Sequence, residues 1–238
     1  MNGRKHWEIE RDGICMSEIE KWTAVDQYMS DVLIPKDSTL EGVLQTNAAA
    51  NLPAHDVSPM QGKFLQLLVQ IQGARNVLEI GTLGGYSTIW LARALPSGGR
   101  VVTLEASEKH AEIARSNIER ANLTDKIEIR TGLALDSLQQ IENEKYEPFD
   151  FIFIDADKQN NPAYFEWALK LSRPGTVIIG DNVVRKGEVI DNTSTDPRVQ
   201  GIRRFYELIA AEPRVSATAL QTVGSKGYDG FVMAIVKE

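Results

Sequence analysis

The chain has almost no cysteine and no long apolar segment. Cys15 is the one cysteine among 238 residues, so no disulfide can form within the chain and nothing points to an oxidising compartment. No apolar run approaches the roughly 20 residues that a transmembrane helix needs. Residues 1–20 are polar and lack the apolar core of a signal peptide. We therefore expect a soluble, cytoplasmic protein with no membrane partner.

Positive charge and histidine are also scarce. The chain carries 26 Lys and Arg residues against 33 Asp and Glu residues, a formal net charge of -7, which leaves no basic footprint for nucleic acid. The three histidines, His6, His55 and His110, are scattered, and the absence of clustered His and Cys argues against a zinc site. We expect these histidines at the surface or in loops, and we expect no nucleic-acid partner.

The remaining composition is that of an ordinary globular protein. Hydrophobic residues make up 42% and charged residues 25% of the chain, and 238 residues can bury the core of a single domain. We expect residues 1–16 to form an N-terminal extension and residues 17–238 to form one domain. Its first part, residues 17–75, is predicted to be a helical cap, in which Trp22 and Tyr28 lie on a packing face.

After this cap, predicted strands and helices alternate. Strands are predicted at residues 77–80, 101–105, 127–131, 150–154 and 176–180, and helices near residues 87–95, 107–121, 133–142, 162–172 and 198–211. Two late strands, at about 214–222 and 231–236, are predicted to pair antiparallel through a mobile, glycine-rich loop, residues 224–230. The alternation predicts an α/β fold: a Rossmann-like, doubly wound, mostly parallel seven-stranded sheet with an antiparallel C-terminal strand and helices on both faces.

A glycine-rich turn follows the first strand of the alternation. The segment Val77–Ser87 reads as a short buried strand, a turn with three glycines and the start of a helix that Ser87 and Thr88 can cap or open. This arrangement is typical of a nucleotide-type cofactor site. The dinucleotide fingerprint, however, requires a second glycine where this chain has Leu83, so the turn lacks the feature that a pyrophosphate needs most.

An acidic residue, Glu105, ends the next predicted strand, at about the distance where an acid binds ribose hydroxyls. Ribose recognition without pyrophosphate recognition indicates an adenosine ligand that has no phosphates. S-adenosylmethionine fits this description, and Glu79 could face its cationic methionine end. The alternative is that the glycines form only a tight turn.

Polar residues also follow the fourth and fifth predicted strands. Asp155 comes after the fourth strand, and Asp181 and Asn182 come after the fifth. Parallel strands that are neighbours end at the same rim of a sheet, so these three oxygen ligands are expected together, where they suit Mg²⁺ or Ca²⁺. The alternative is that they are ordinary polar residues at strand exits and turns.

Taken together, these motifs resemble those of the cation-dependent class I O-methyltransferases, the family of caffeoyl-CoA and catechol O-methyltransferases, and the bacterial members most of all. The resemblance runs from about Ser17 to the C-terminus. Its motifs are Val77–Thr82 with Gly85–Ser87, Phe149–Asp150 leading to Asp155–Lys158, and Arg173–Gly175 leading to Asp181–Asn182.

The resemblance implies a role for each matching residue. It implies that S-adenosylmethionine is bound by Val57, Glu79, Gly81, Thr82, Tyr86, Ser87, Glu105, Ala134, Asp155, Asp157 and Tyr164. In this set Glu105 would bind the ribose and Ala134 would border the adenine. Asp155, Asp181 and Asn182 match metal ligands, with Mg²⁺ expected and Ca²⁺ or Mn²⁺ as alternatives. Lys158 matches a lysine proposed as general base, and Arg185 stands where many bacterial relatives have a tryptophan that faces the acceptor.

The expected function is metal-dependent methyl transfer from S-adenosylmethionine to a small vicinal dihydroxy aromatic such as a catechol, a caffeoyl compound or a flavonoid. A divalent ion chelated by two hydroxyls lowers their pKa and fixes their orientation. Two alternatives remain from the sequence: a nucleotide-cofactor dehydrogenase, and a non-catalytic binding or RNA-associated module of the same fold. The resemblance also implies a homodimer.

Overall fold

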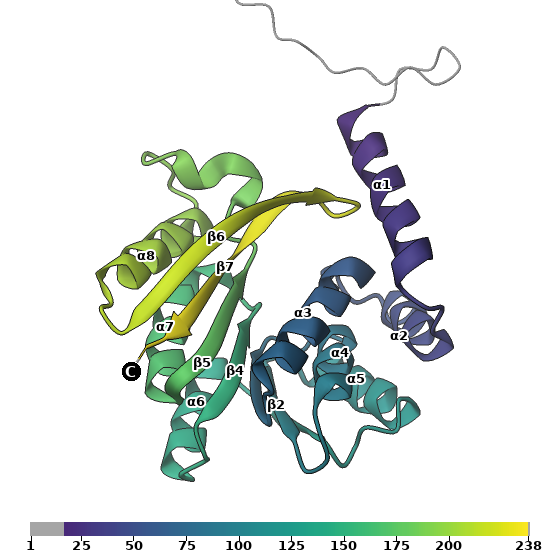
Figure 1. The fold of residues 1–238 in the computed structure, drawn as a ribbon, viewed down its shortest axis with the longest axis horizontal. Coiled ribbons are helices and arrows are strands. Elements are labelled where there is room, and N and C mark those ends of the chain that lie inside the picture. Colours follow the sequence, from purple (N-terminus) through teal and green to yellow (C-terminus); the bar gives the residue numbers. More distant parts are fainter. Residues whose placement is uncertain (1–16, 238) are drawn as a thin grey trace, which may run out of the picture.

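A seven-stranded sheet forms the centre of the molecule (Figure 1). The computed structural model describes residues 17–237, and the predicted extension, residues 1–16, lies outside them. The strand order is β3-β2-β1-β4-β5-β7-β6. The strands are β1 (Asn76–Ile80), β2 (Arg100–Glu105), β3 (Ile127–Thr131), β4 (Phe149–Ile154), β5 (Ser172–Asp181), β6 (Val215–Gly224) and β7 (Gly227–Val236).

The helices flank this sheet. Three precede the first strand, as the apolar spacing predicted, and the others alternate with the strands. They are α1 (Glu18–Leu33), α2 (Ser38–Ala49), α3 (Pro59–Gln72), α4 (Tyr86–Ala94), α5 (Glu108–Arg120), α6 (Ala134–Asn143), α7 (Asn161–Lys170) and α8 (Pro197–Ala211), with short 3-10 helices η1 (Lys158–Asn160) and η2 (Arg185–Ile190). No helix in the described part of the chain is both long and apolar enough to cross a membrane.

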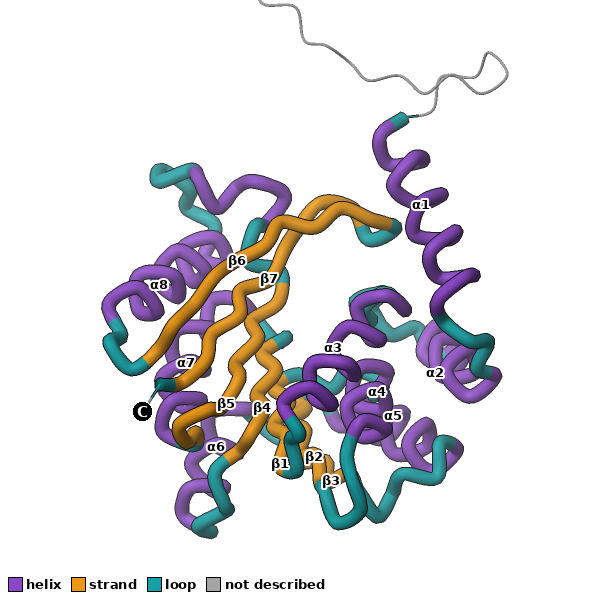
Figure 2. The backbone as a smooth tube through the Cα atoms, viewed as in Figure 1, coloured by secondary structure: helices purple, strands orange, loops and turns teal. Residues whose placement is uncertain are grey.

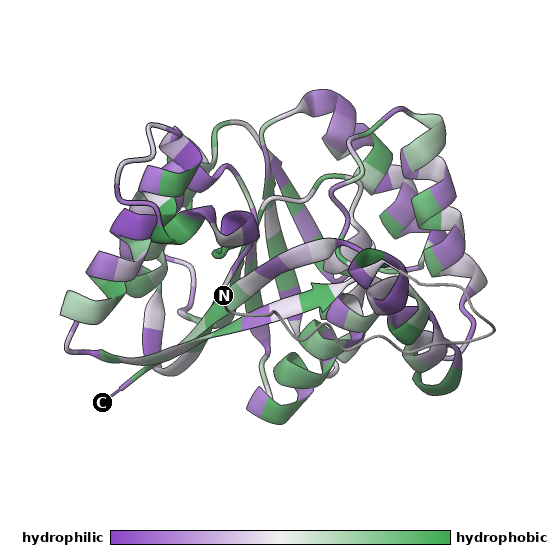
Figure 3. Cartoon of the chain, turned by 90° about the horizontal axis from the view of Figure 1, so that it is seen from above, coloured by the Kyte–Doolittle hydropathy of each residue, from purple (hydrophilic) through white to green (hydrophobic). Residues whose placement is uncertain are grey.

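Helices cover both faces of the sheet, as the view from above shows (Figure 3). Side chains from α6, α7 and α8 pack on one face and side chains from α3, α4 and α5 pack on the other. The central strand β4 is buried along its whole length, and all of its residues except Asp150 are apolar. β1, β2, β3, β4 and β5 run parallel, whereas β7 pairs antiparallel with β5 and with β6. The predicted fold is therefore confirmed.

The strand order reverses at β1, which lies between β2 and β4. Ile80, the last residue of β1, pairs with Leu104 on one side and Ile154 on the other, so the three strands end at the same level. In open α/β sheets, ligands bind beyond the carboxyl ends of the strands at such a reversal. The topology therefore places the glycine turn, Glu105 and Asp155 at the same rim of the sheet.

One local prediction was wrong and a second was correct in part. Residues 224–230 do not form a mobile loop, because β6 and β7 continue into a tight hairpin whose turn is Ser225–Lys226. Ser87 and Thr88 lie in the first turn of α4 and so open the helix, but they do not cap it, because α4 starts from Gly85 with φ 83° and no side-chain cap. Both hydroxyls bind a buried carboxylate instead, as described below.

Helix α1 is more exposed to solvent than the packing face predicted for it. None of its residues is buried, and Tyr28, predicted on a packing face, is 69% exposed. Figure 2 shows α1 set apart from the sheet, with the tip of the β6–β7 hairpin beside it. Asp26 makes this contact, since its Oδ2 accepts hydrogen bonds from the backbone N–H (2.7 Å) and the hydroxyl (3.0 Å) of Ser225.

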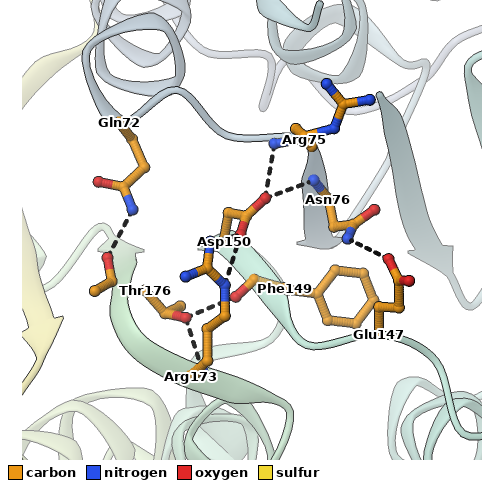
Figure 4. Close-up of polar contacts among 9 residues, drawn as sticks. Gln72, Arg75, Asn76, Glu147, Phe149, Asp150, Arg173 and Thr176 are labelled. Atoms are coloured by element: carbon orange, nitrogen blue, oxygen red, sulfur yellow. Dashed lines mark hydrogen bonds and ion pairs between the residues drawn. The ribbon is translucent and has the colours of Figure 1, made fainter. Parts of the chain in front are cut away.

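At the opposite rim of the sheet, a buried carboxylate ties three strands together (Figure 4). Asp150 accepts hydrogen bonds from the backbone N–H groups of Arg75 (2.7 Å) and Asn76 (2.9 Å), and from the guanidinium of Arg173 (2.5 Å). Burial alone raises the pKa of Asp150, but these donors outweigh it and hold the pKa below its usual range. The Phe149–Asp150 motif of the sequence therefore has a structural role, away from the site.

We predict that Asp150→Ala lowers the free energy of unfolding by about 2–3 kcal/mol, because it leaves two backbone N–H groups without an acceptor. The stabilisation by Asp150 is present at neutral pH and is lost as the pH falls through its depressed folded-state pKa. Urea denaturation of the wild type and the variant at neutral and acidic pH measures both effects.

Glu147→Ala is the matched control, since the exposed Glu147 carboxylate makes only a long contact (3.4 Å) to Asn76. It should change the free energy of unfolding by no more than about 0.5 kcal/mol. Equal losses in the two variants would contradict the role given to Asp150.

Candidate active site

The glycine turn lies directly against the end of β4. A Cβ atom at Gly81 would lie 2.2 Å from the carbonyl oxygen of Asp155, and Gly81 has a φ of 104°. Both observations require glycine at this position. The backbone of Asp155 is held there by a hydrogen bond from its N–H to the Ile80 carbonyl (2.8 Å). The predicted cofactor turn and the first predicted metal ligand are therefore neighbours.

Glu79, at the end of β1, is completely buried and surrounded by hydroxyl groups. Its carboxylate accepts hydrogen bonds from Ser87 Oγ (2.6 Å), Thr88 Oγ1 (2.5 Å) and Thr103 Oγ1 (2.6 Å), and Thr103 in turn contacts Thr82 Oγ1 (2.6 Å). Burial raises the pKa of Glu79 to about 7, although the three hydroxyls act in the opposite direction. A cation nearby would hold this carboxylate in its ionised form.

Glu105, at the end of β2, is joined to the glycine turn. Its carboxylate accepts hydrogen bonds from the backbone N–H groups of Leu83 (2.8 Å) and Ser107 (2.9 Å). Leu83, which replaces the second fingerprint glycine, has a φ of 50° and so directs its N–H to the acid. His110 Nδ1 lies 3.3 Å from Glu105 Oε1. His110 was predicted at the surface or in a loop, because nothing in its spacing indicates this contact.

The other residues predicted to bind the cofactor lie on several different elements. Asp157 accepts hydrogen bonds from the Tyr164 hydroxyl (2.5 Å) and from Asn160 Nδ2 (2.5 Å). Burial and the Asp157 carboxylate raise the pKa of Tyr164, which therefore acts as a donor. Tyr86 is buried at the start of α4, Val57 is buried in the loop before α3, and Ala134 is the half-buried first residue of α6.

The predicted metal ligands leave the sheet side by side. Ile154 on β4 pairs with Gly180 on β5, so Asp155 and Asp181 are the next residues along two neighbouring parallel strands. Asn182 follows with a φ of 55° and donates its backbone N–H to Asp181 Oδ1 (2.8 Å). Among the described residues no three His, Cys, Asp or Glu side chains group closely enough for a metal ion. The predicted set has two carboxylates, and its third member is an amide.

Lys158 and Gln61 each hold one of these carboxylates. Lys158, which is 6% exposed, donates from Nζ to Asp155 Oδ1 at 2.7 Å. Gln61 on α3 donates from Nε2 to Asp181 Oδ2 at 2.6 Å. Burial and the neighbouring charge of Asp155 raise the pKa of Asp181 to about 7. Nothing in the sequence indicates this role for Gln61, which lies 120 residues before its partner.

A buried polar network holds the glycine turn against helices α2 and α5. The sequence did not predict this network. Asn117 Nδ2 on α5 donates to the Gly84 carbonyl (2.9 Å) and to Asn47 Oδ1 on α2 (3.0 Å), and Asn47 donates to Asp56 (2.9 Å). A Cβ at Gly84 would lie 2.0 Å from Asn47 Oδ1. The turn is thus packed against the helical cap, and glycine is needed at position 84 for this contact.

Arg185, predicted to face the acceptor, begins η2 in the segment after Asn182. Its backbone N–H and that of Val184 donate to Asp229 Oδ1 at 3.1 and 2.9 Å, which anchors the segment to β7. Arg185 and Lys186 have φ values of 55° and 56°, which non-glycine residues rarely adopt. The segment after β5 therefore has a strained backbone that Asp229 holds in place.

Comparison with known proteins agrees with this geometry. A family described as O-methyltransferase matches residues 29–234. A protein named catechol O-methyltransferase from Niastella koreensis is 56% identical over 214 residues, which are 90% of this chain and 97% of the relative. A second protein of that name, from Mycobacterium tuberculosis, is 49% identical over 213 residues, 90% of this chain and 95% of the relative.

A solved structure of an O-methyltransferase is also similar to this chain. The crystal structure of an O-methyltransferase from Bacillus cereus in complex with SAH is 92% identical to this chain and covers 92% of it and 100% of its own length, with a TM-score of 0.92. The similarity therefore extends over the site as well as the sheet. The predicted resemblance is confirmed: the chain is an enzyme that belongs to the O-methyltransferase family.

Proposed function

We propose that this enzyme transfers a methyl group from S-adenosylmethionine to one hydroxyl of a small aromatic vicinal diol, and that the reaction requires a divalent cation. One observation carries the proposal. At one rim of the sheet, the glycine turn and Glu105 lie next to the three residues predicted to bind the metal, Asp155, Asp181 and Asn182. The names of the Niastella and Mycobacterium relatives support the acceptor class. Membership of the family favours this function over a dehydrogenase or a non-catalytic module.

The residues of the rim suit a cationic adenosine ligand. S-adenosylmethionine, when bound, supplies an electrophilic methyl group. Glu105 lies where it can accept both ribose hydroxyls, while its bonds to the backbone of Leu83 and Ser107 keep it in place. Buried Glu79 contributes negative charge beneath the turn. Asp157, which is exposed and held by Tyr164, is placed to accept from an ammonium group.

The donor set also suits a hard divalent cation. Asp155, Asp181 and Asn182 provide oxygen ligands of the kind that Mg²⁺, Ca²⁺ and Mn²⁺ prefer. The two carboxylates are close enough for the charge of Asp155 to raise the pKa of Asp181, a repulsion that a cation relieves. Such an ion lowers the pKa of a coordinated hydroxyl and orients it.

Lys158 is the best-placed side chain to receive a proton from the acceptor. It is buried beside the proposed metal ligands and contacts one of them, Asp155, directly. A lysine held in this position lies within reach of any hydroxyl bound near Asp155. Arg185 borders the same region and is proposed to contact the acceptor.

We also propose that two copies of the chain form a homodimer that covers α1, whose apolar side chains Ile19, Val25, Tyr28 and Val32 are 49–69% exposed. Light scattering at micromolar concentration tests this, and a monomer would contradict it. A cytoplasmic location stays a prediction.

For the cofactor, we predict that Glu105→Ala weakens binding of S-adenosylmethionine more than tenfold, because charge-assisted hydrogen bonds to the ribose are lost. Calorimetric titration measures the change. Glu108→Ala is the control, since the Glu108 side chain is 63% exposed on the neighbouring helix, and its affinity should equal that of the wild type. Unchanged affinity in Glu105→Ala would remove this residue from the site.

For the metal, we predict that excess EDTA abolishes methyl transfer to catechol and that added Mg²⁺ restores it. Asp181→Ala should remove turnover while circular dichroism and the affinity for S-adenosylmethionine stay close to those of the wild type, because Asp181 is assigned to the metal rather than to the cofactor. Full activity in EDTA is the result that excludes a metal mechanism.

For the base, we predict that Lys158→Ala lowers kcat by on the order of 10²-fold, with a smaller effect on cofactor affinity. Lys158→Arg should not restore kcat, because a guanidinium stays protonated and cannot accept the proton. Lys170→Ala, a change at a lysine whose side chain is 53% exposed on α7, is the control. A wild-type kcat in Lys158→Ala would mean that the metal alone activates the acceptor.

A further inference from the structure

Asn47, near the end of α2, fastens the loop that leads to α3. The residue is only 2% exposed. Its backbone carbonyl accepts a hydrogen bond from the N–H of Leu52 (3.0 Å), and its Nδ2 donates to Asp56 Oδ1 (2.9 Å). Figures 1 and 2 both show α2 beside α4 and α5, the two helices next to the glycine turn. Asn47 therefore lies between this loop and the turn.

The hydrogen bonds from Asp56 to the turn run in one direction. An ionised carboxylate can only accept, so Asn47 presents Nδ2 to Asp56 and Oδ1 to Asn117. Asn117 Nδ2 then donates both to this oxygen (3.0 Å) and to the Gly84 carbonyl (2.9 Å). Burial raises the pKa of Asp56, and the hydrogen bond from Asn47 acts in the opposite direction. The carboxylate thus sets the orientation of two amides and, through them, of the Gly84 peptide.

Gly84 also fits against Asn47 without spare room. A Cβ at Gly84 would lie 2.0 Å from Oδ1, 2.3 Å from Cγ and 2.3 Å from Nδ2 of Asn47, and these are its three nearest atoms. Gly84 does not have a positive φ, unlike Gly81 and Gly85. An alanine at position 84 is therefore opposed by the Asn47 side chain and not by its own backbone.

The two segments that meet at Asn47 each carry a residue assigned to the cofactor. Val57 follows Asp56 in the loop and is buried, and Tyr86 is the buried first residue of α4, two positions after Gly84. Burial raises the pKa of Tyr86, and the negative charge of Asp56 adds to this shift, so the loop and the start of α4 lie close together. A ligand that contacts both segments binds best when their relative placement is fixed in advance.

We propose that Asn47 is a positioning residue for the cofactor. Through Asp56 and Asn117 it holds the loop before α3 and the glycine turn in the relative placement that S-adenosylmethionine needs. This inference rests on the cofactor assignment of the proposed function and adds to it a contribution from the helical cap. Since coupling between two sites is reciprocal, cofactor binding at the turn also stabilises α2, which carries no residue assigned to the cofactor.

The first test is the affinity for SAH, measured by calorimetry. Asn47→Ala and Asn117→Ala should each weaken binding about tenfold or more, because the turn and the loop lose their fixed placement. Arg120→Ala is the matched control, since Arg120 joins the same two helices through an exposed contact to Thr46 Oγ1 (2.9 Å); its affinity should equal that of the wild type. Wild-type affinity in both asparagine variants, or an equal loss in Arg120→Ala, would overturn the proposal.

A second-site variant separates positioning from a general loss of stability. Gly84→Ala in the wild-type background places a methyl group against Asn47 and should weaken SAH binding at least tenfold. In the Asn47→Ala background the methyl group has space, so Gly84→Ala should cause no more than about a twofold further loss. The same loss in both backgrounds would overturn the proposal, because Asn47 would then not determine the position of the turn.

Hydrogen exchange of the wild-type enzyme tests the reciprocal effect without any variant. Saturating SAH should slow exchange of the backbone amides in residues 43–50 at the end of α2. Helix α8 is the internal control, because it also carries no residue assigned to the cofactor and lies on the other face of the sheet. Exchange in α2 that SAH does not slow, or slows no more than in α8, would contradict the coupling.

These outcomes also distinguish the proposal from the proposed function. A wild-type enzyme that does not bind SAH contradicts the cofactor assignment itself. A wild-type enzyme that binds SAH, together with unchanged affinity in Asn47→Ala and Asn117→Ala, contradicts only the positioning role of Asn47.

Discussion

The site depends on the close approach of two strand ends. β1 and β4 come so near at their carboxyl ends that a side chain at Gly81 would collide with the Asp155 carbonyl at 2.2 Å. The same approach brings the glycine turn, which is assigned to the cofactor, against the first residue assigned to the metal. Donor and acceptor of a methyl group must lie in line at short distance, and this contact between backbones provides the proximity before any ligand binds.

Acidic groups gather at this rim, and each is held by a different kind of partner. Three hydroxyls surround Glu79, two backbone N–H groups hold Glu105, and an amide, Gln61, holds Asp181. Buried carboxylates are costly unless they are hydrogen-bonded or paired with a cation. The partners fix the orientation of each acid, while burial, with a smaller contribution from the charge of Asp155, raises the pKa of Glu79 and of Asp181 to about 7. A rim of this kind favours cationic ligands.

The sequence predicted the fold and the two motifs because both depend on local patterns: apolar strands, turns that need glycine, and polar residues at strand ends. It could not predict Gln61 against Asp181 or Asn47 against Asn117, because these contacts join helices far apart in the chain and have no characteristic spacing. It also could not predict that Ser87 and Thr88 donate to Glu79 rather than cap the helix, since only the fold brings Glu79 next to them. The hairpin at 224–230 was misread because its glycines suggested a loop, whereas strand pairing continues through them.

The central claim is that a divalent ion at Asp155, Asp181 and Asn182 binds both hydroxyls of the acceptor. Electron paramagnetic resonance of Mn²⁺ in the enzyme saturated with SAH tests it most directly, with catechol whose two oxygens carry ¹⁷O. We predict that the labelled catechol broadens the Mn²⁺ lines of the wild type and that the bound Mn²⁺ signal is absent in Asp181→Ala. Tight binding of catechol with no broadening by ¹⁷O would contradict the account.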